Sequence, residues 1–174
     1  GLANGMIRPI VKFGGDTLHR PAEAIQTVTA DIAALARDMI DTMHAAPGIG
    51  LAAPQLGVPI RLFVVDLSLG HNPQELIALV NPVFVEREGM QLEEEGCLSL
   101  PGFNATVARP ERATVKGLDL EGREHFYSGD GLLARAFQHE MDHLDGRVFI
   151  DRLRGVKRSL ILHRIRKRMR KGAW

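Results

Sequence analysis

The clearest hydrophobic pattern in the chain has helical periodicity. After Thr29, apolar residues recur at spacings of three and four: Ile32, Leu35, Ala36, Met39 and Met43. Such spacing puts them on one face of an α-helix. Thr29 is a suitable N-cap, and Pro47 with Gly48 would stop the helix. The pattern therefore predicts an amphipathic helix from about residue 30 to residue 45.

Shorter runs rich in β-branched and aromatic residues predict strands and hairpins. They cover residues 61–67, 77–86 and 113–120, and the last continues through a Glu-Gly turn into residues 125–128. Helical patterns return at about 131–144, with Asp130 as a cap candidate and Gly146 after the end, and at about 155–171. Helices segregated from hairpins favour an α+β fold with antiparallel sheets.

The length of 174 residues suits one domain, which we expect over residues 6–174. Residues 1–5 precede the first methionine and look like an appended remnant or a processed end. No apolar stretch predicts a membrane span or a secretory signal. Cys97 is the only cysteine, so no internal disulfide can form, which fits a reducing compartment. We therefore expect a bacterial cytoplasmic protein, or the mature form of an organellar one.

Charge is distributed unevenly. The first 151 residues hold 12 basic and all 21 acidic residues, a net charge of −9, whereas the rest carries 10 basic residues and no acid. An acidic body with a basic end indicates a catalytic domain whose tail meets a polyanion or an acidic surface.

Candidate chemistry centres on the HExxH sequence of residues 139–143 in the second predicted helix. His139 and His143 are four residues apart, so both project from one helical face and can bind one metal ion. Glu140, next to His139, can reach a water molecule on that ion and act as general acid and base. The pattern predicts a metal-dependent hydrolase.

The third ligand of such a site must come from upstream. A catalytic metal site uses three protein ligands and keeps one position open. No glutamate follows Glu140, and Phe149 stands where the metzincin pattern needs its last histidine. The remaining downstream histidine, His163, lies in the basic tail. Cys97 is thus the leading candidate.

Three segments together resemble the signature motifs of the peptide deformylases: Gly48–Gln55 (GIGLAAPQ), Glu95–Ser99 (EGCLS) and Gln138–His143 (QHEMDH). The resemblance implies antiparallel sheets around a central HExxH helix, flanked by an N-terminal helix and a basic C-terminal one. It also implies Cys97, His139 and His143 as metal ligands, and removal of the formyl group from N-terminal formyl-methionine. The physiological ion would be Fe2+, one per chain, with Zn2+, Ni2+ or Co2+ able to replace it in purified protein.

Further site residues follow from the resemblance alone. The side-chain amide of Gln55 and the backbone N–H of Leu98 would stabilise the oxyanion. Ile49, Gly50 and Gly96 would provide closely approachable backbone for an extended peptide. Leu132 and Ala136 would form the apolar pocket for the methionine side chain.

Two positions depart from the family pattern. Asn104 stands where many relatives carry an arginine that orders the glutamate equivalent to Glu95. Arg135 stands where relatives often carry an aliphatic residue. We expect its stem to line the pocket while its head reaches water.

Two other functions are open at this point. One is another HExxH metallohydrolase acting on peptides or small acylated amines, and the other is a ribosome- or RNA-binding protein with a structural metal. The tail has an apolar stripe, Val156, Leu160, Ile161, Ile165 and Met169, against a dense basic face. Since deformylase relatives are held to dock on the ribosome through their C-terminal helix, we expect ribosome binding from about Arg164 onward, with neither DNA nor a membrane as partner. The oligomeric state is left open.

Overall fold

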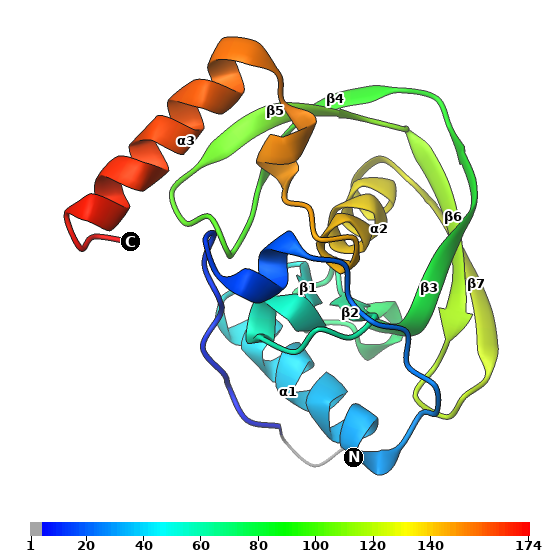
Figure 1. The fold of residues 1–174 in the computed structure, drawn as a ribbon. Coiled ribbons are helices and arrows are strands. Elements are labelled where there is room, and N and C mark those ends of the chain that lie inside the picture. The colour runs from blue at the N-terminus through cyan, green and yellow to red at the C-terminus, as the bar shows by residue number, and fades with distance from the viewer. Residues whose placement is uncertain (1–4) are drawn as a thin grey trace.

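The computed structural model describes residues 5–174 as two antiparallel sheets and three α-helices, one of which lies at the centre of the molecule (Figure 1). The helices are α1 (Ala30–Ala45), α2 (Gly131–Leu144) and α3 (Gly155–Arg170). The strands are β1 (Gly50–Ala52), β2 (Leu62–Val65), β3 (Ile77–Glu88), β4 (Gln91–Gly96), β5 (Asn104–Arg109), β6 (Arg112–Leu118) and β7 (Glu124–Asp130). Short 3₁₀ turns are η1 (Asp16–His19), η2 (Ala53–Leu56), η3 (Pro73–Glu75) and η4 (Phe149–Arg152). The predicted α+β class with antiparallel sheets is confirmed.

The larger sheet has the order β1-β2-β3-β6-β7, and every pair in it is antiparallel. Strand β2 shows why its sequence is apolar throughout. Leu62 and Val64 pack with the α1 cluster, whereas Phe63 and Val65 pack with α2. Successive side chains of a strand point to opposite faces, so a strand covered on both sides must be apolar at every position.

The three predicted helices are confirmed, with one local correction. Thr29 caps α1, its hydroxyl accepting a hydrogen bond from the N–H of Ile32 at 3.4 Å. Asp130 occupies the N-cap position of α2, but its side chain makes no capping hydrogen bond. That part of the prediction is wrong, because Glu111 instead accepts from the N–H of Gly131, through both its carbonyl and its carboxylate.

Strands β4 and β5 form a separate two-stranded sheet that was not predicted from the sequence. They lie above α2 in Figure 1, on the side opposite β1 and β2. Their six-residue register pairs Gly96 with Asn104 and ends directly before Cys97. The hairpin thus carries the cysteine to the central helix.

Helix α3 extends away from the body, beside β5 (Figure 1). Its buried face is made of Ile161, Leu162 and Ile165, which pack with Phe103 and Phe149. The predicted apolar stripe is therefore wrong at its start: Val156 is 74% and Leu160 49% exposed. Leu162, which the stripe left out, is buried beside Ile161 and Ile165 instead.

The residues after α3 return to the body. The indole N–H of Trp174 donates to the carbonyl of Phe13 at 2.9 Å, and its ring lies edge-on to Phe103, with centroids 5.9 Å apart. At the other end, the N–H of Gly5 donates to Asp41 at 2.6 Å, while residues 1–4 of the expected remnant lie outside the described residues. No helix within residues 5–174 is long and apolar enough to cross a membrane.

Candidate metal centre and substrate cavity

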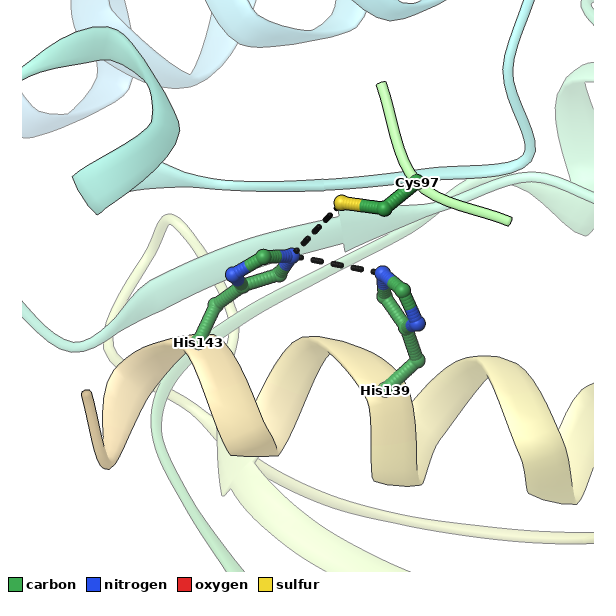
Figure 2. Close-up of side chains that lie close together, drawn as sticks. All are labelled: Cys97, His139 and His143. Carbon is green, nitrogen blue, oxygen red and sulfur yellow. Dashed lines mark hydrogen bonds between the residues drawn. The ribbon is translucent and has the colours of Figure 1, made fainter. Parts of the chain in front are cut away.

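Cys97, His139 and His143 converge at the centre of the molecule (Figure 2). Both histidines project from the same side of α2, as their four-residue spacing predicted, and Cys97 reaches them from the turn that follows β4. A hydrogen bond from the N–H of Leu100 to the carbonyl of Cys97 closes this turn at 3.0 Å. The sulfur also accepts from the N–H of Ser99 at 3.4 Å.

The distances between the three side chains fit a metal site. Sγ of Cys97 lies 3.3 Å from Nε2 of His143, which lies 3.2 Å from Nε2 of His139. All three ligand atoms lie within 4.8 Å of one another. A tetrahedral ion with bonds of about 2.0–2.3 Å separates its ligand atoms by roughly 3.3–3.8 Å. This arrangement therefore accommodates one ion without moving the backbone.

The electrostatics of the three ligands also suit a cation. Burial and the nearby charge of His139 hold the pKa of His143 well below its usual value, so His143 is neutral. Burial opposes protonation of His139 too, but Glu140 and Cys97 outweigh it and raise the pKa of His139 well above its usual value. The negative groups that stabilise an extra proton on His139 would equally stabilise a metal cation in the place of that proton.

Glu95 organises the surroundings of His139. Its carboxylate accepts from Nδ1 of His139 at 2.6 Å, which leaves the lone pair of Nε2 directed at the cluster. Arg109 binds both carboxylate oxygens, at 2.8 and 2.7 Å. Burial works against ionisation of Glu95, but the bonds from Arg109 and His139 hold its pKa well below the usual range.

Arg135 corrects two expectations about this network. Its guanidinium donates to Glu95 at 2.7 Å, to the side chain of Gln91 at 2.9 Å and to the carbonyl of Val107 at 2.7 Å. The side chain is buried, so its head does not reach water as expected. Asn104 stands where many relatives carry an arginine, but Glu95 is still held in a fixed position because Arg109 and Arg135 bind it.

Glu140 lies beside the ligands and is buried. Its Oε2 abuts Gly50 so closely that a side chain at that position would collide with it. Its Oε1 has no hydrogen-bond partner among residues 5–174. Burial, with His139 opposing it, raises the pKa of Glu140 to about 7. A carboxylate with this pKa can both take and give a proton near neutral pH.

Gln55 is held with its amide nitrogen toward the cysteine. Its Oε1 accepts from the N–H of Ala52 at 2.9 Å, which fixes the orientation of the amide. Its Nε2 then donates to the hydroxyl of Ser99 at 3.1 Å and faces Sγ of Cys97 at 3.7 Å. Within residues 5–174, the backbone N–H of Leu98 makes no hydrogen bond. The amide of Gln55 thus points toward the ligand cluster, and the backbone N–H of Leu98 is free beside it.

A cavity of about 570 Å³ opens beside these groups. The structure brings together in its lining every predicted site residue except His143, which is buried behind it: Ile49, Gly50, Gln55, Gly96, Cys97, Leu98, Leu132, Ala136, His139 and Glu140. It adds Leu69, Pro101 and Gly102, which the sequence did not assign to the cavity, and it includes Arg135, whose stem was expected to line the pocket.

Comparison with known proteins gives a consistent picture. Residues 7–159 match the family described as polypeptide deformylase. The chain is 52% identical over 169 residues to a peptide deformylase of Acidobacterium capsulatum, covering 97% of this chain and 99% of the relative. It is 51% identical to one from Thermodesulfovibrio yellowstonii, covering 88% and 93%. The crystal structure of a Legionella pneumophila peptide deformylase, 42% identical, superposes with a TM-score of 0.88 over 96% of this chain and 98% of that one.

Proposed function

Because the chain belongs to the polypeptide deformylase family and removes the N-formyl group from nascent polypeptides, we propose that Cys97, His139 and His143 hold its metal ion. The observation that carries this assignment is the convergence of the three ligand atoms within 4.8 Å of one another. Glu140 then moves the protons of the reaction. The comparisons do not favour a different metallohydrolase.

The proposed physiological ion is Fe2+, one per chain. A thiolate with two imidazoles also suits Zn2+, Ni2+ and Co2+, which can replace it in purified protein. When bound, the ion supplies Lewis-acid chemistry by polarising a carbonyl oxygen and lowering the pKa of a water ligand. The charges around His139 that favour a cation support the assignment.

Glu140 is the proposed general acid and base. With its pKa near neutrality, its carboxylate takes a proton from the attacking water molecule and passes that proton to the departing amine. Its contact with Gly50 keeps the carboxylate beside the cavity. The role requires the unpaired Oε1 to stay free of other hydrogen bonds, and within residues 5–174 it does.

Two donors are proposed to stabilise the oxyanion that forms as the formyl carbon is attacked. Gln55 offers Nε2, oriented by the bond from Ala52, and Leu98 offers its backbone N–H. Donors already in place cost no reorganisation during the reaction, and each is typically worth about 3 kcal/mol.

The substrate peptide is proposed to lie extended between two backbone segments, pairing with Ile49 and Gly96 while Gly50 allows close approach. Leu132 and Ala136 would receive the methionine side chain. Both residues line the cavity on the side of α2 that carries His139, which supports this placement.

One experiment tests ligand set, metal and reaction together. The protein is purified anaerobically, its metal is quantified, and formate release is measured on formyl-Met and acetyl-Met peptides of matched sequence. We expect one Fe2+ per chain and release of formate, with negligible release of acetate. Equal turnover of the two peptides would contradict the assignment of a deformylase site.

We also propose that the basic tail binds the ribosome from about Arg164 onward, in the cytoplasm of a bacterial cell. The density of positive charge on α3 supports this: among residues 5–174 only Arg158 of its cations forms an ion pair, so a polyanion is needed to offset the rest. Truncation before Arg164 is a poor test, because it would remove buried Ile165 and the packing of Trp174 on Phe103.

Substitution within the intact chain is sharper. Arg166→Gln with Arg170→Gln should weaken co-sedimentation with ribosomes and lower the dependence of log K on log salt by about one unit for each phosphate that is no longer bound. The matched control is Arg112→Gln with Arg123→Gln, two exposed cations away from α3. Equal binding by both double variants would remove α3 from this role.

A further inference from the structure

A second cavity, of about 330 Å³, lies between α3 and the loop that follows Cys97. One wall is formed by Gly102, Phe103 and Asn104. The other wall belongs to α3: Ile161, Arg164, Lys167, Arg168 and Lys171. We call this the basic cavity. It contains four cations and no acidic residue, so it attracts anions.

The positive charges of the basic cavity are not neutralised within the protein. Among residues 5–174, none of its four cations forms an ion pair, whereas Arg158 earlier in α3 pairs with Asp151. Arg168 is held in position, with its guanidinium 4.7 Å above the ring of Phe103 and Nη1 donating to the carbonyl of Pro101 at 3.3 Å. The remaining donors of the guanidinium can therefore meet a ligand without first being ordered.

The basic cavity adjoins the substrate cavity. Gly102 lines both of them, and Pro101, whose carbonyl is bound by Arg168, lines the substrate cavity. A peptide whose formyl group lay at Cys97 and whose chain left over the 101–102 loop would enter the basic cavity. In an extended chain each residue advances about 3.3 Å, so it arrives within a few residues.

We propose that the basic cavity is a substrate subsite for acidic side chains located a few residues after the formyl-methionine. This rests on the proposed placement of the peptide in the substrate cavity. An aspartate or glutamate in this subsite would be bound by Arg168, with Lys167 and Lys171 at its rim. The family match ends at residue 159, so these cations lie outside the matched range. At this cavity, in contrast to the face of α3 that carries Arg166 and Arg170, a peptide ligand is favoured over RNA because the cavity continues the substrate cavity through Gly102.

The test compares formyl-Met hexapeptides that carry Glu or Gln at one position, moved in turn from the third to the sixth residue. At one or more positions, kcat/KM should be about 3- to 10-fold higher for Glu, through a lower KM, as expected for one or two partly exposed ion pairs. The preference should shrink as salt is raised. In the variant Lys167→Gln with Lys171→Gln, the ratio of kcat/KM between the two peptides should fall toward one.

The matched control is Arg166→Gln with Arg170→Gln, which removes the same charge from a different face of α3, where Val156 and Leu160 are exposed. This control should retain the preference for Glu. The subsite is overturned if the wild type turns over both peptides equally at every position, or if both double variants lose the preference alike. Failure of the proposed function is distinguishable, because then the wild type would release no formate from any of the peptides.

Discussion

Arg135 donates a hydrogen bond from Nη1 to Oε1 of Glu95 at 2.7 Å, and both side chains are buried. The other oxygen of that carboxylate receives Nδ1 of His139 at 2.6 Å. The arginine therefore acts on a proposed metal ligand through one intervening residue. Such outer partners fix the ring orientation and raise the basicity of a ligating histidine.

Replacing Arg135 by Met should weaken both folding and metal binding. Removing one partner of a buried ion pair typically costs about 3–5 kcal/mol when the other charge is left without compensation, and because Arg109 still binds Glu95 the cost here should lie near the lower end of that range. We expect a loss of this size in urea unfolding of the metal-free protein, and metal affinity about 10- to 100-fold lower in competition with a chelator. The control Arg112→Met removes an exposed partner of Glu88 and should change the stability far less, because water screens that ion pair. Equal effects of the two substitutions would contradict a role for Arg135 in holding Glu95 and, through it, His139.

Cys97→Ser should reduce metal affinity and formate release together. The thiolate offsets part of the charge of the ion, and a neutral hydroxyl does not. Serine has nearly the shape of cysteine, so its hydroxyl takes the place of a sulfur that lies 3.3 Å from Nε2 of His143. Metal content is measured after gel filtration, alongside activity. A serine variant that kept stoichiometric metal and full turnover would refute the ligand assignment.

Glu140→Ala should keep the metal but lower kcat by about 10²- to 10⁴-fold, because the carboxylate transfers protons without binding the ion. Glu140→Gln, which keeps the shape against Gly50, should be similarly slow. Metal analysis and formate release on the same samples separate the two effects. Loss of the ion from both variants would make Glu140 a ligand and the proposed proton transfer wrong.

Periodicity was enough to predict the three helices and the longer strands, and the motifs brought Cys97, His139 and His143 together as the structure has them. They did not predict β4, whose sequence QLEEEG lacks an apolar alternation because its buried positions are the polar residues Gln91 and Glu95, which accept hydrogen bonds from Arg135. The meeting of Arg109 and Arg135 on Glu95 depends on the β4–β5 register and on the position of α2 beneath it. Such long-range pairing of charges is not contained in local spacing.

Gln55→Leu should lower kcat by about 10²- to 10³-fold while changing KM much less, as expected for a donor that acts in the transition state. The leucine also leaves the N–H of Ala52 and the hydroxyl of Ser99 without their partner. Ser99→Ala, which removes one of those hydrogen bonds but not the amide, serves as the comparison. Steady-state kinetics on a formyl-Met tripeptide distinguish the two, and an effect of Gln55→Leu confined to KM would make Gln55 a ground-state contact.

Asp66 has a buried carboxylate that accepts four hydrogen bonds at the edge of the substrate cavity. The donors are the N–H and hydroxyl of Ser68, the N–H of Gly70 and Nε2 of His44, at 2.6 to 2.9 Å. They hold in place the loop that carries Leu69, which lines the cavity at a φ of 56°. Burial raises the pKa of Asp66, but the bonds from Ser68 and His44 outweigh it, so the pKa lies below its usual value.

Asp66→Asn should therefore destabilise the protein in a pH-dependent way. At pH 7 we expect a loss of about 2–3 kcal/mol in the free energy of unfolding, since a charged acceptor is replaced by a group that carries a donor. A carboxyl with a lowered folded pKa contributes stability above its unfolded pKa of about 3.9 and loses it as pH falls through the folded value. The difference between wild type and variant should accordingly narrow only below about pH 3.9. Urea titrations at steps from pH 7 to pH 3, with exposed Glu121→Gln as control, measure it. A difference that stays constant over this range would show that the carboxylate charge plays no part.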